Sequence, residues 1–142
     1  MKTALFASFV LMLAPKATSA QTNDDIIDIE VVVQAFAAAG DLQDAQALEQ
    51  ILHPYYRSVV HRVMGSPDTK VLDKATYVQL MRDKKIGGDK RTVKILHTEV
   101  EQNTAVVKAV LTGQTLKFTT FLSLVRLPEG GWQIVSDMPQ VN

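Results

Sequence analysis

The side chains best suited to chemistry lie in one segment, residues 55–63, where tyrosine, arginine and histidine are interspersed with valine. In an extended strand Tyr55, Arg57 and His61 share one side, because successive side chains point to opposite faces. An imidazole exchanges protons near neutral pH, and a guanidinium binds carboxylates and carbonyls. If this side faces an enclosed space, we expect ligand contacts or an acid–base centre built on His61. A slip of one residue would instead turn inward Tyr56, Ser58, Val60 and Arg62.

Further polar or aromatic candidates lie on other predicted strands. Trp132 suits packing in a core or an interface, with stacking on a flat heterocycle as the alternative. Asp137 is interpreted as an exposed carboxylate at a strand end, or as one facing the mouth of a cavity. His97, Glu99 and Glu101 share a strand face, but they span too great a length for one ion. We therefore predict no metal site and no cofactor.

Composition excludes several function classes. The 142 residues carry 15 basic and 15 acidic side chains and no cysteine. Basic residues gather between residues 82 and 94, but no aromatic side chain lies among them, and nucleic-acid binding needs a clustered basic surface or stacking platforms. The sequence contains no recognisable nucleophile triad, phosphate-binding glycine loop or Cys/His cluster. We expect no nucleic-acid partner and no disulfides.

The first twenty residues have the pattern of a secretory signal peptide. Lys2 precedes an apolar run at residues 4–14, and small residues follow at 17–20. The run is shorter than the about 20 residues that span a bilayer. Cleavage after Ala20 would remove two lysines and leave 13 basic against 15 acidic residues, a net charge of −2. We expect a periplasmic or secreted protein without a stable membrane anchor, with residues 21–142 forming one domain.

Helical signals dominate the first half of this domain. Apolar residues recur at helical spacing from residue 26 to residue 37, and Gly40 is predicted to end that helix. Asp41 is predicted to cap a second helix that ends before Pro54. Asp73 is predicted to cap a third helix, which extends to residue 86.

Strand signals dominate the second half. After residues 55–64, strands are predicted at 93–100, 105–111, 116–127 and 132–138, with short turns between them. This order predicts an α+β fold, in which three helices cover a curved antiparallel sheet and enclose a cavity. The strand at 116–127 carries apolar residues on both faces, so we expect its second face to be buried in a homodimer. Self-burial by a strongly curved sheet is the alternative.

Three segments resemble the NTF2-like superfamily, in particular its SnoaL-like and putative lumazine-binding branch. They are residues 31–56, residues 73–86 and residues 121–138, and their most specific parts are Ala39-Gly40-Asp41 and Gly131 to Val135. The resemblance spans residues 26–138 and implies a cone with mixed pairing at one edge of the sheet. It also favours the register in which Tyr55, Arg57 and His61 face the cavity.

The superfamily includes ketosteroid isomerase, which uses an aspartate base and two oxyanion donors, a tyrosine and a protonated aspartic acid. By alignment these positions fall near His61, Val33 and Thr120. Valine donates no hydrogen bond and threonine is a weaker donor than a carboxylic acid, so the resemblance does not carry the isomerase site over.

The leading hypothesis is thus an exported accessory domain that binds a small apolar or aromatic molecule without an assembled catalytic centre. Its predicted pocket residues are Tyr55, Arg57, His61, Thr120 and Trp132. The first alternative is an isomerase, dehydratase or cyclase with His61 as base, and the second is a dimeric scaffold protein.

Overall fold

The computed structural model describes residues 20–141, so the predicted signal peptide lies outside the described residues except for Ala20. The helices are α1 (Ala20–Leu42), α2 (Ala45–Ile51) and α3 (Lys74–Arg82). The strands are β1 (Leu52–His61), β2 (Thr69–Asp73), β3 (Thr92–Glu101), β4 (Thr104–Thr112), β5 (Lys117–Arg126) and β6 (Trp132–Val141). None of the helices in this range is both long enough and apolar enough to cross a membrane.

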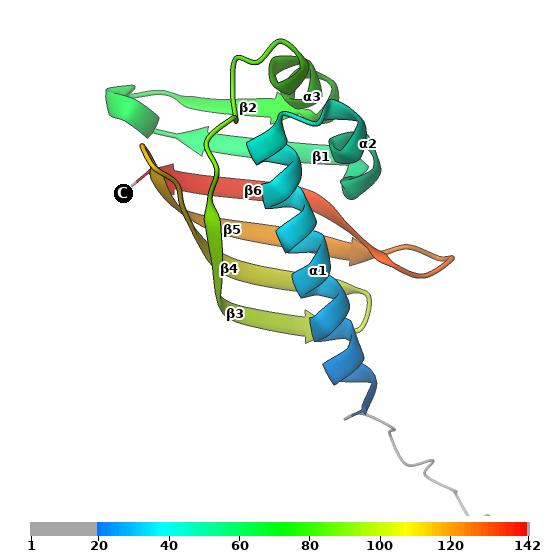
Figure 1. The fold of residues 1–142 in the computed structure, drawn as a ribbon. Coiled ribbons are helices and arrows are strands. Elements are labelled where there is room, and N and C mark those ends of the chain that lie inside the picture. Colours follow the sequence, from blue (N-terminus) through cyan, green and yellow to red (C-terminus); the bar gives the residue numbers. More distant parts are fainter. Residues whose placement is uncertain (1–19, 142) are drawn as a thin grey trace, which may run out of the picture.

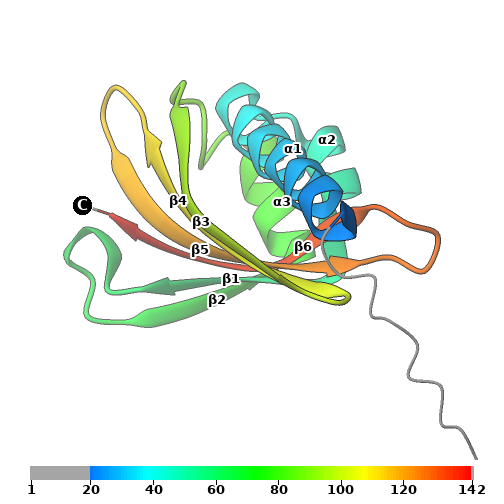
Figure 2. The ribbon, with the colours of Figure 1, turned by 90° about the horizontal axis from the view of Figure 1, so that it is seen from below.

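The strands form one sheet in the order β2-β1-β6-β5-β4-β3 (Figure 1). All neighbours are antiparallel except β1 and β6, which run parallel. The predicted α+β class and the meander from β3 to β6 are therefore confirmed. Register shifts interrupt the β3–β4, β5–β6 and β1–β6 ladders. Such bulges bend and twist strands, and the sheet is strongly curved (Figure 2).

The three helices lie on the concave face of the sheet, where the apolar core forms (Figure 2). Helix α1 crosses the sheet and buries Ile29, Val33 and Phe36, which belong to its predicted apolar side. On β4 every second residue from Ala105 to Leu111 is buried, as expected for a strand with one covered face. The periodicities that predicted helix and strand are thus the ones that build the core.

The end of α1 corrects two predictions. The helix continues past Gly40 to Leu42, and Gln43 takes the left-handed conformation with φ 54°. Asp44, not Asp41, caps α2, since its carboxylate accepts a hydrogen bond from the Ala47 amide at 2.9 Å. At Gly40 a Cβ would lie 2.6 Å from Nη2 of Arg91, so the absence of a side chain there leaves room for the guanidinium beside α1.

Strand β2 was not predicted from the sequence. It is an edge strand of five residues that pairs with β1, and all its residues are exposed except the partly buried Leu72. An edge strand with so little burial has no apolar alternation to reveal it. The prediction that Asp73 caps α3 is confirmed, because its carboxylate accepts a hydrogen bond from the Thr76 amide at 2.8 Å.

The convex face of the sheet is not covered by any helix of the described chain (Figure 2). Three apolar side chains on its central strands remain exposed: Val106 by 49%, Phe121 by 46% and Met138 by 43%. Phe121 pairs with Met138 across β5 and β6, so the two lie side by side. We call the face that carries these three residues the outer face.

Candidate functional site

A cavity of about 390 Å³ lies between the concave face of the sheet, helix α3 and the loop that follows α3. Its walls are mainly apolar, with contributions from Phe36, Leu111 and Phe118 among others. Its polar wall residues on the sheet are Ser58, Thr120 and Asp137, each at most 5% exposed. A volume near the lower end of the usual range for ligand pockets, about 300–1,000 Å³, suits a small ring system.

The register of β1 is the opposite of the one favoured by the resemblance. Tyr56 is fully buried, and Ser58 and Val60 line the cavity, whereas Tyr55 is 75% exposed. Arg57 and His61 are exposed on the other side of the strand. The physical reason is that Tyr56 gains a buried hydrogen-bond partner and ring contacts that Tyr55 could not reach.

Arg57 and His61 are engaged outside the cavity. Nη1 of Arg57 donates to the Tyr56 carbonyl oxygen at 2.6 Å. Nδ1 of His61 lies 2.6 Å from the Thr69 hydroxyl on the neighbouring strand β2. Neither side chain lines the cavity. His61 is therefore out of reach of a molecule held there, and an enzyme hypothesis based on it loses its base.

Of the two remaining predicted pocket residues, Thr120 lines the cavity and Trp132 does not. Thr120 lines the cavity from β5, and its Oγ1 is buried without a hydrogen-bond partner in the described residues. Trp132 lies in the core away from the cavity, with the Arg126 guanidinium 4.8 Å from its ring centroid. Arg126 also forms an ion pair with Asp25 of α1. This ion pair links the N-terminal part of α1 to the end of β5.

A buried pair, Tyr56 and Asp137, dominates the electrostatics of the site. The Tyr56 hydroxyl donates to Oδ1 of Asp137 at 2.6 Å, and the Asp137 side chain is also hydrogen-bonded to Ser58. Burial raises the pKa of Asp137 to about 6, although these two hydrogen bonds act in the opposite direction. Burial and the Asp137 charge raise the pKa of Tyr56 far above its ordinary value, so Tyr56 remains a donor.

Aromatic rings hold this pair in place. The Tyr56 ring meets the Tyr77 ring edge to face at 5.3 Å, and Tyr77 stacks on Phe36 at 6.3 Å. These contacts join β1, α3 and α1, and such ring pairs add stability beyond the area that they bury. Tyr77 and Phe36 also line the cavity, so the same contacts shape its wall.

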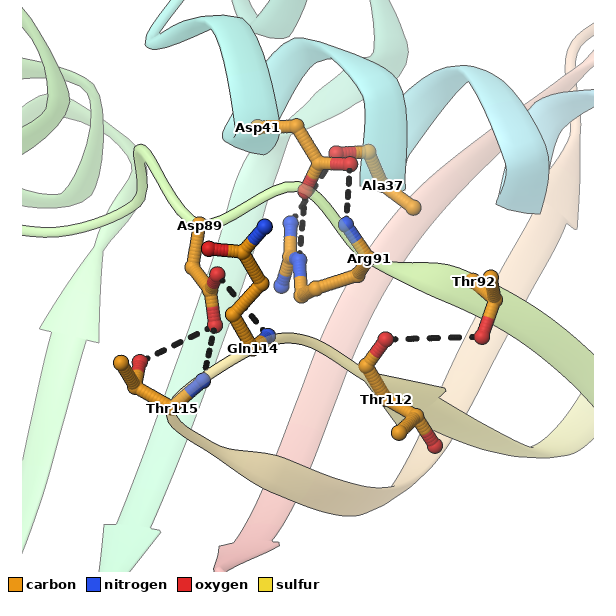
Figure 3. Close-up of polar contacts among 8 residues, drawn as sticks. All are labelled: Ala37, Asp41, Asp89, Arg91, Thr92, Thr112, Gln114 and Thr115. Atoms are coloured by element: carbon orange, nitrogen blue, oxygen red, sulfur yellow. Dashed lines mark hydrogen bonds and ion pairs between the residues drawn. The ribbon is translucent and has the colours of Figure 1, made fainter.

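An ion pair fixes the loop before β3, which carries the cavity-lining residues Gly87 and Arg91 and which we call the rim of the cavity. Figure 3 shows this ion pair. Nε of Arg91 donates to Oδ1 of Asp41 at 2.6 Å, and the Arg91 amide donates to Oδ2 at 2.9 Å. Nη2 of Arg91 donates to the Ala37 carbonyl at 3.0 Å, which attaches the rim to the last turns of α1. This is what Asp41 does in place of the predicted capping role.

A second carboxylate braces the same rim. Asp89 accepts hydrogen bonds from the backbone amides of Gln114 and Thr115 at 3.1 and 3.2 Å and from the Thr115 hydroxyl at 3.1 Å (Figure 3). These bonds lower the pKa of Asp89. Asp89 thus links the loop before β3 to the turn between β4 and β5, while Arg91 links the same loop to α1.

The importance of Asp137 was hidden by a bulge in β6. Ile134 pairs with Leu124 and Ser136 pairs with Ser123, so one residue is inserted between these pairs. The buried side chains are therefore the even-numbered Trp132 and Ile134 before the bulge and the odd-numbered Asp137 after it. Strict alternation would have turned Asp137 away from the core. Tyr56 could have been suspected from the alternative register of β1, which the sequence left open.

No group of three metal-ligating side chains comes together within residues 23–141. His97 and Glu99 approach each other at 3.7 Å on the exposed side of β3, and both side chains are more than 60% exposed. This pair is a surface contact of a kind that contributes little to stability.

A curved mixed sheet, helices on its concave face and a cavity between them define an NTF2-like protein. Residues 14–138 match the family described as "Putative lumazine-binding", and the chain belongs to this family. No curated protein matches the chain.

Solved structures share the fold. An NTF2-like protein of unknown function from Silicibacter pomeroyi is 21% identical with a TM-score of 0.73, covering 85% of this chain and 98% of its own. Similar proteins of unknown function come from Shewanella baltica (13%, TM-score 0.72, 88% and 98% covered) and Methylobacillus flagellatus (18%, 0.71, 89% and 96%). The predicted superfamily and branch are thus confirmed.

Proposed function

We propose that this protein binds a small, flat, mostly apolar molecule in its cavity and acts as a binding or accessory domain. The observation that carries the proposal is an apolar-walled cavity of about 390 Å³ with a few buried polar groups on the strands that form its floor. Apolar walls contribute affinity, and a few polar groups fix orientation. The family description adds lumazine, a flat heterocycle, as a first candidate ligand.

The proposal can be tested by filling the cavity. Phe118 lines it, whereas Phe121 lies on the same strand but faces outward. Phe118→Trp would reduce the space for a ligand, and Phe121→Trp makes the same substitution on the opposite face. A thermal-shift screen with lumazine, related heterocycles and apolar metabolites should identify compounds that stabilise the wild-type protein.

A compound at a hundred times its Kd should stabilise the fold by about 2.7 kcal/mol, a shift on the order of 10 °C. Phe118→Trp should weaken that binding at least about tenfold, and Phe121→Trp should leave it unchanged. Binding that is equally strong in both variants, or a wild-type protein that responds to no compound, would overturn the proposal.

We further propose that the outer face pairs with a second copy of the chain. In an isologous dimer each surface meets itself, so the face must be self-complementary. Its centre holds the three exposed apolar residues and Lys108, whose Nζ lies 5.6 Å from the Phe121 ring centroid. Glu99 and Glu101 lie at the C-terminal end of β3, and Lys94 of β3 and Lys117 of β5 lie toward the opposite end of the sheet. A two-fold rotation about the centre would bring the acidic end over the basic end.

Export is also proposed, on the basis of the signal-peptide pattern in residues 1–20. Mass spectrometry of the protein recovered from a bacterial periplasm or medium should give the mass of residues 21–142. Recovery of only the full-length chain from the cytosol would contradict the proposal.

A further inference from the structure

The floor of the cavity carries three polar side chains in neighbouring positions. Ser58 of β1 pairs with Asp137 of β6, and Asp137 pairs in turn with Leu122 of β5. Thr120 lies two residues before Leu122, on the same face of β5 and in the adjacent row. Diagonal neighbours of this kind in an antiparallel sheet are close enough for one small molecule to contact both Thr120 and Asp137.

Asp137 has hydrogen-bonding capacity left over. An ionised carboxylate has about four lone-pair sites and accepts only. The Tyr56 hydroxyl and Ser58 engage this carboxylate. No lysine, arginine or histidine of the described chain forms an ion pair with Asp137. A buried carboxylate in this state is stabilised by one more donor, and it repels an anion.

The hydroxyl group of Thr120, in turn, is not satisfied within the part of the chain that the structure describes. Thr120 is 3% exposed, and its Oγ1 has no hydrogen-bond partner in the described residues. A buried hydroxyl without a partner is costly, and such groups in native proteins call for an explanation. Rotation of the side chain to another staggered rotamer exchanges the positions of the methyl and hydroxyl groups. A cavity-bound carbonyl would then accept a hydrogen bond from this hydroxyl.

We infer that the ligand binds through an edge on which an N–H group stands beside a carbonyl, as in a lactam or a cyclic imide. The N–H donates to Asp137, and the carbonyl accepts from Thr120. The inference rests on the proposed binding function and specifies the chemical class of the ligand. Carboxylate or phosphate groups are excluded from this end of the cavity by the charge of Asp137.

Matched pairs of compounds test the inference. Lumazine has two ring N–H groups beside carbonyls and phthalimide has one. Their fully N-methylated derivatives, 1,3-dimethyllumazine and N-methylphthalimide, keep the rings and the carbonyls but lack every such N–H. Isothermal titration calorimetry at neutral pH should show the N–H member binding about 10- to 100-fold more tightly, as expected for a hydrogen bond to a charged group.

Variants assign the preference to particular atoms. In Asp137→Asn the amide oxygen can still accept from Tyr56, but the amide group presents N–H donors to the ligand. The preference for the N–H compound should therefore vanish or reverse. Thr120→Val should weaken both members of a pair by a similar factor, because both retain the carbonyl, and Thr120→Ser should restore binding. The N–H to N-methyl ratio would not change in Asp137→Asn if Asp137 served only the fold.

The outcomes separate this inference from the proposed function. If the N-methyl compounds bind as tightly as the N–H compounds, the inference is wrong and the binding function stands. The same conclusion follows if neither pair binds while other compounds from the thermal-shift screen do. If no compound binds at all, both fall.

Discussion

Replacement of Asp137 by asparagine should change how stability depends on pH. Asp137 is 5% exposed, and its carboxylate accepts a hydrogen bond from the Tyr56 hydroxyl, with 2.6 Å between the two oxygen atoms. Asparagine keeps an oxygen acceptor for Tyr56 and removes the titration. The difference between wild type and Asp137→Asn therefore isolates the cost of holding a charge at this position.

The magnitude follows from the raised pKa. Burial raises the pKa of Asp137 from 3.8 to about 6, a change of about two units, and each unit corresponds to about 1.4 kcal/mol. Because the folded protein binds this proton more tightly than the unfolded chain, the contribution of Asp137 to wild-type stability should fall as pH rises from about 4 to about 7. Relative to wild type, Asp137→Asn should gain up to about 3 kcal/mol across that range.

Urea unfolding at intervals of pH measures this difference. Asp73→Asn is the control, because Asp73 is exposed and the pKa of Asp73 is lowered, chiefly by its hydrogen bonds with Thr76. Its contribution to stability is present above the unfolded pKa and is lost as pH falls, so its difference curve must slope the other way. A flat difference curve for Asp137→Asn, or one with the slope of Asp73→Asn, would refute the buried-charge reasoning.

Two further predictions concern the rim and the outer face. Gly87 and Gly130 both have positive φ, but only at Gly87 would a Cβ lie 2.3 Å from the Gly40 carbonyl oxygen. Gly87→Ala should therefore destabilise the protein by about 2 kcal/mol more than Gly130→Ala in denaturant unfolding, and equal losses would contradict the close-packing argument. Phe121→Glu should convert a dimer to a monomer in size-exclusion chromatography with light scattering, whereas Val31→Glu on exposed α1 surface should not. A wild-type protein that is already monomeric at micromolar concentration would remove the basis for the dimer.

The elements of the fold could be predicted because local patterns specify them. The strands from β3 to β6 show apolar alternation and short polar turns, and the structure places each within a few residues of its prediction. The buried side of α1 likewise follows from helical spacing. In α1 and β4 one face is clearly more apolar than the other, so the pattern and the packing agree.

The site could be predicted only in part, because its key contacts join distant residues. The two sides of β1 differ little in hydrophobicity, and the choice between them depends on Asp137, which lies 81 residues from Tyr56. Asp137 is itself displaced by a bulge that no local pattern reveals. Asp41 and Arg91 are 50 residues apart, and a terminal capping role for Asp41 was the simplest local interpretation. Thr120 was indicated by the resemblance alone. The structure places Thr120 in the cavity wall, and its contact with a ligand stays a prediction.

The parallel pairing of β1 with β6 has a consequence for how the protein is assembled. The hairpin of β1 and β2 joins the rest of the sheet only through β6, the last strand of the chain. During synthesis Asp137, the hydrogen-bond partner of Tyr56, is added only after almost every other residue. Contacts between such distant segments form slowly, because a long loop must close first. The pocket is thus completed last, and a chain shortened by its final strand would lose both the Asp137 side of the cavity and the link between β1 and the rest of the sheet.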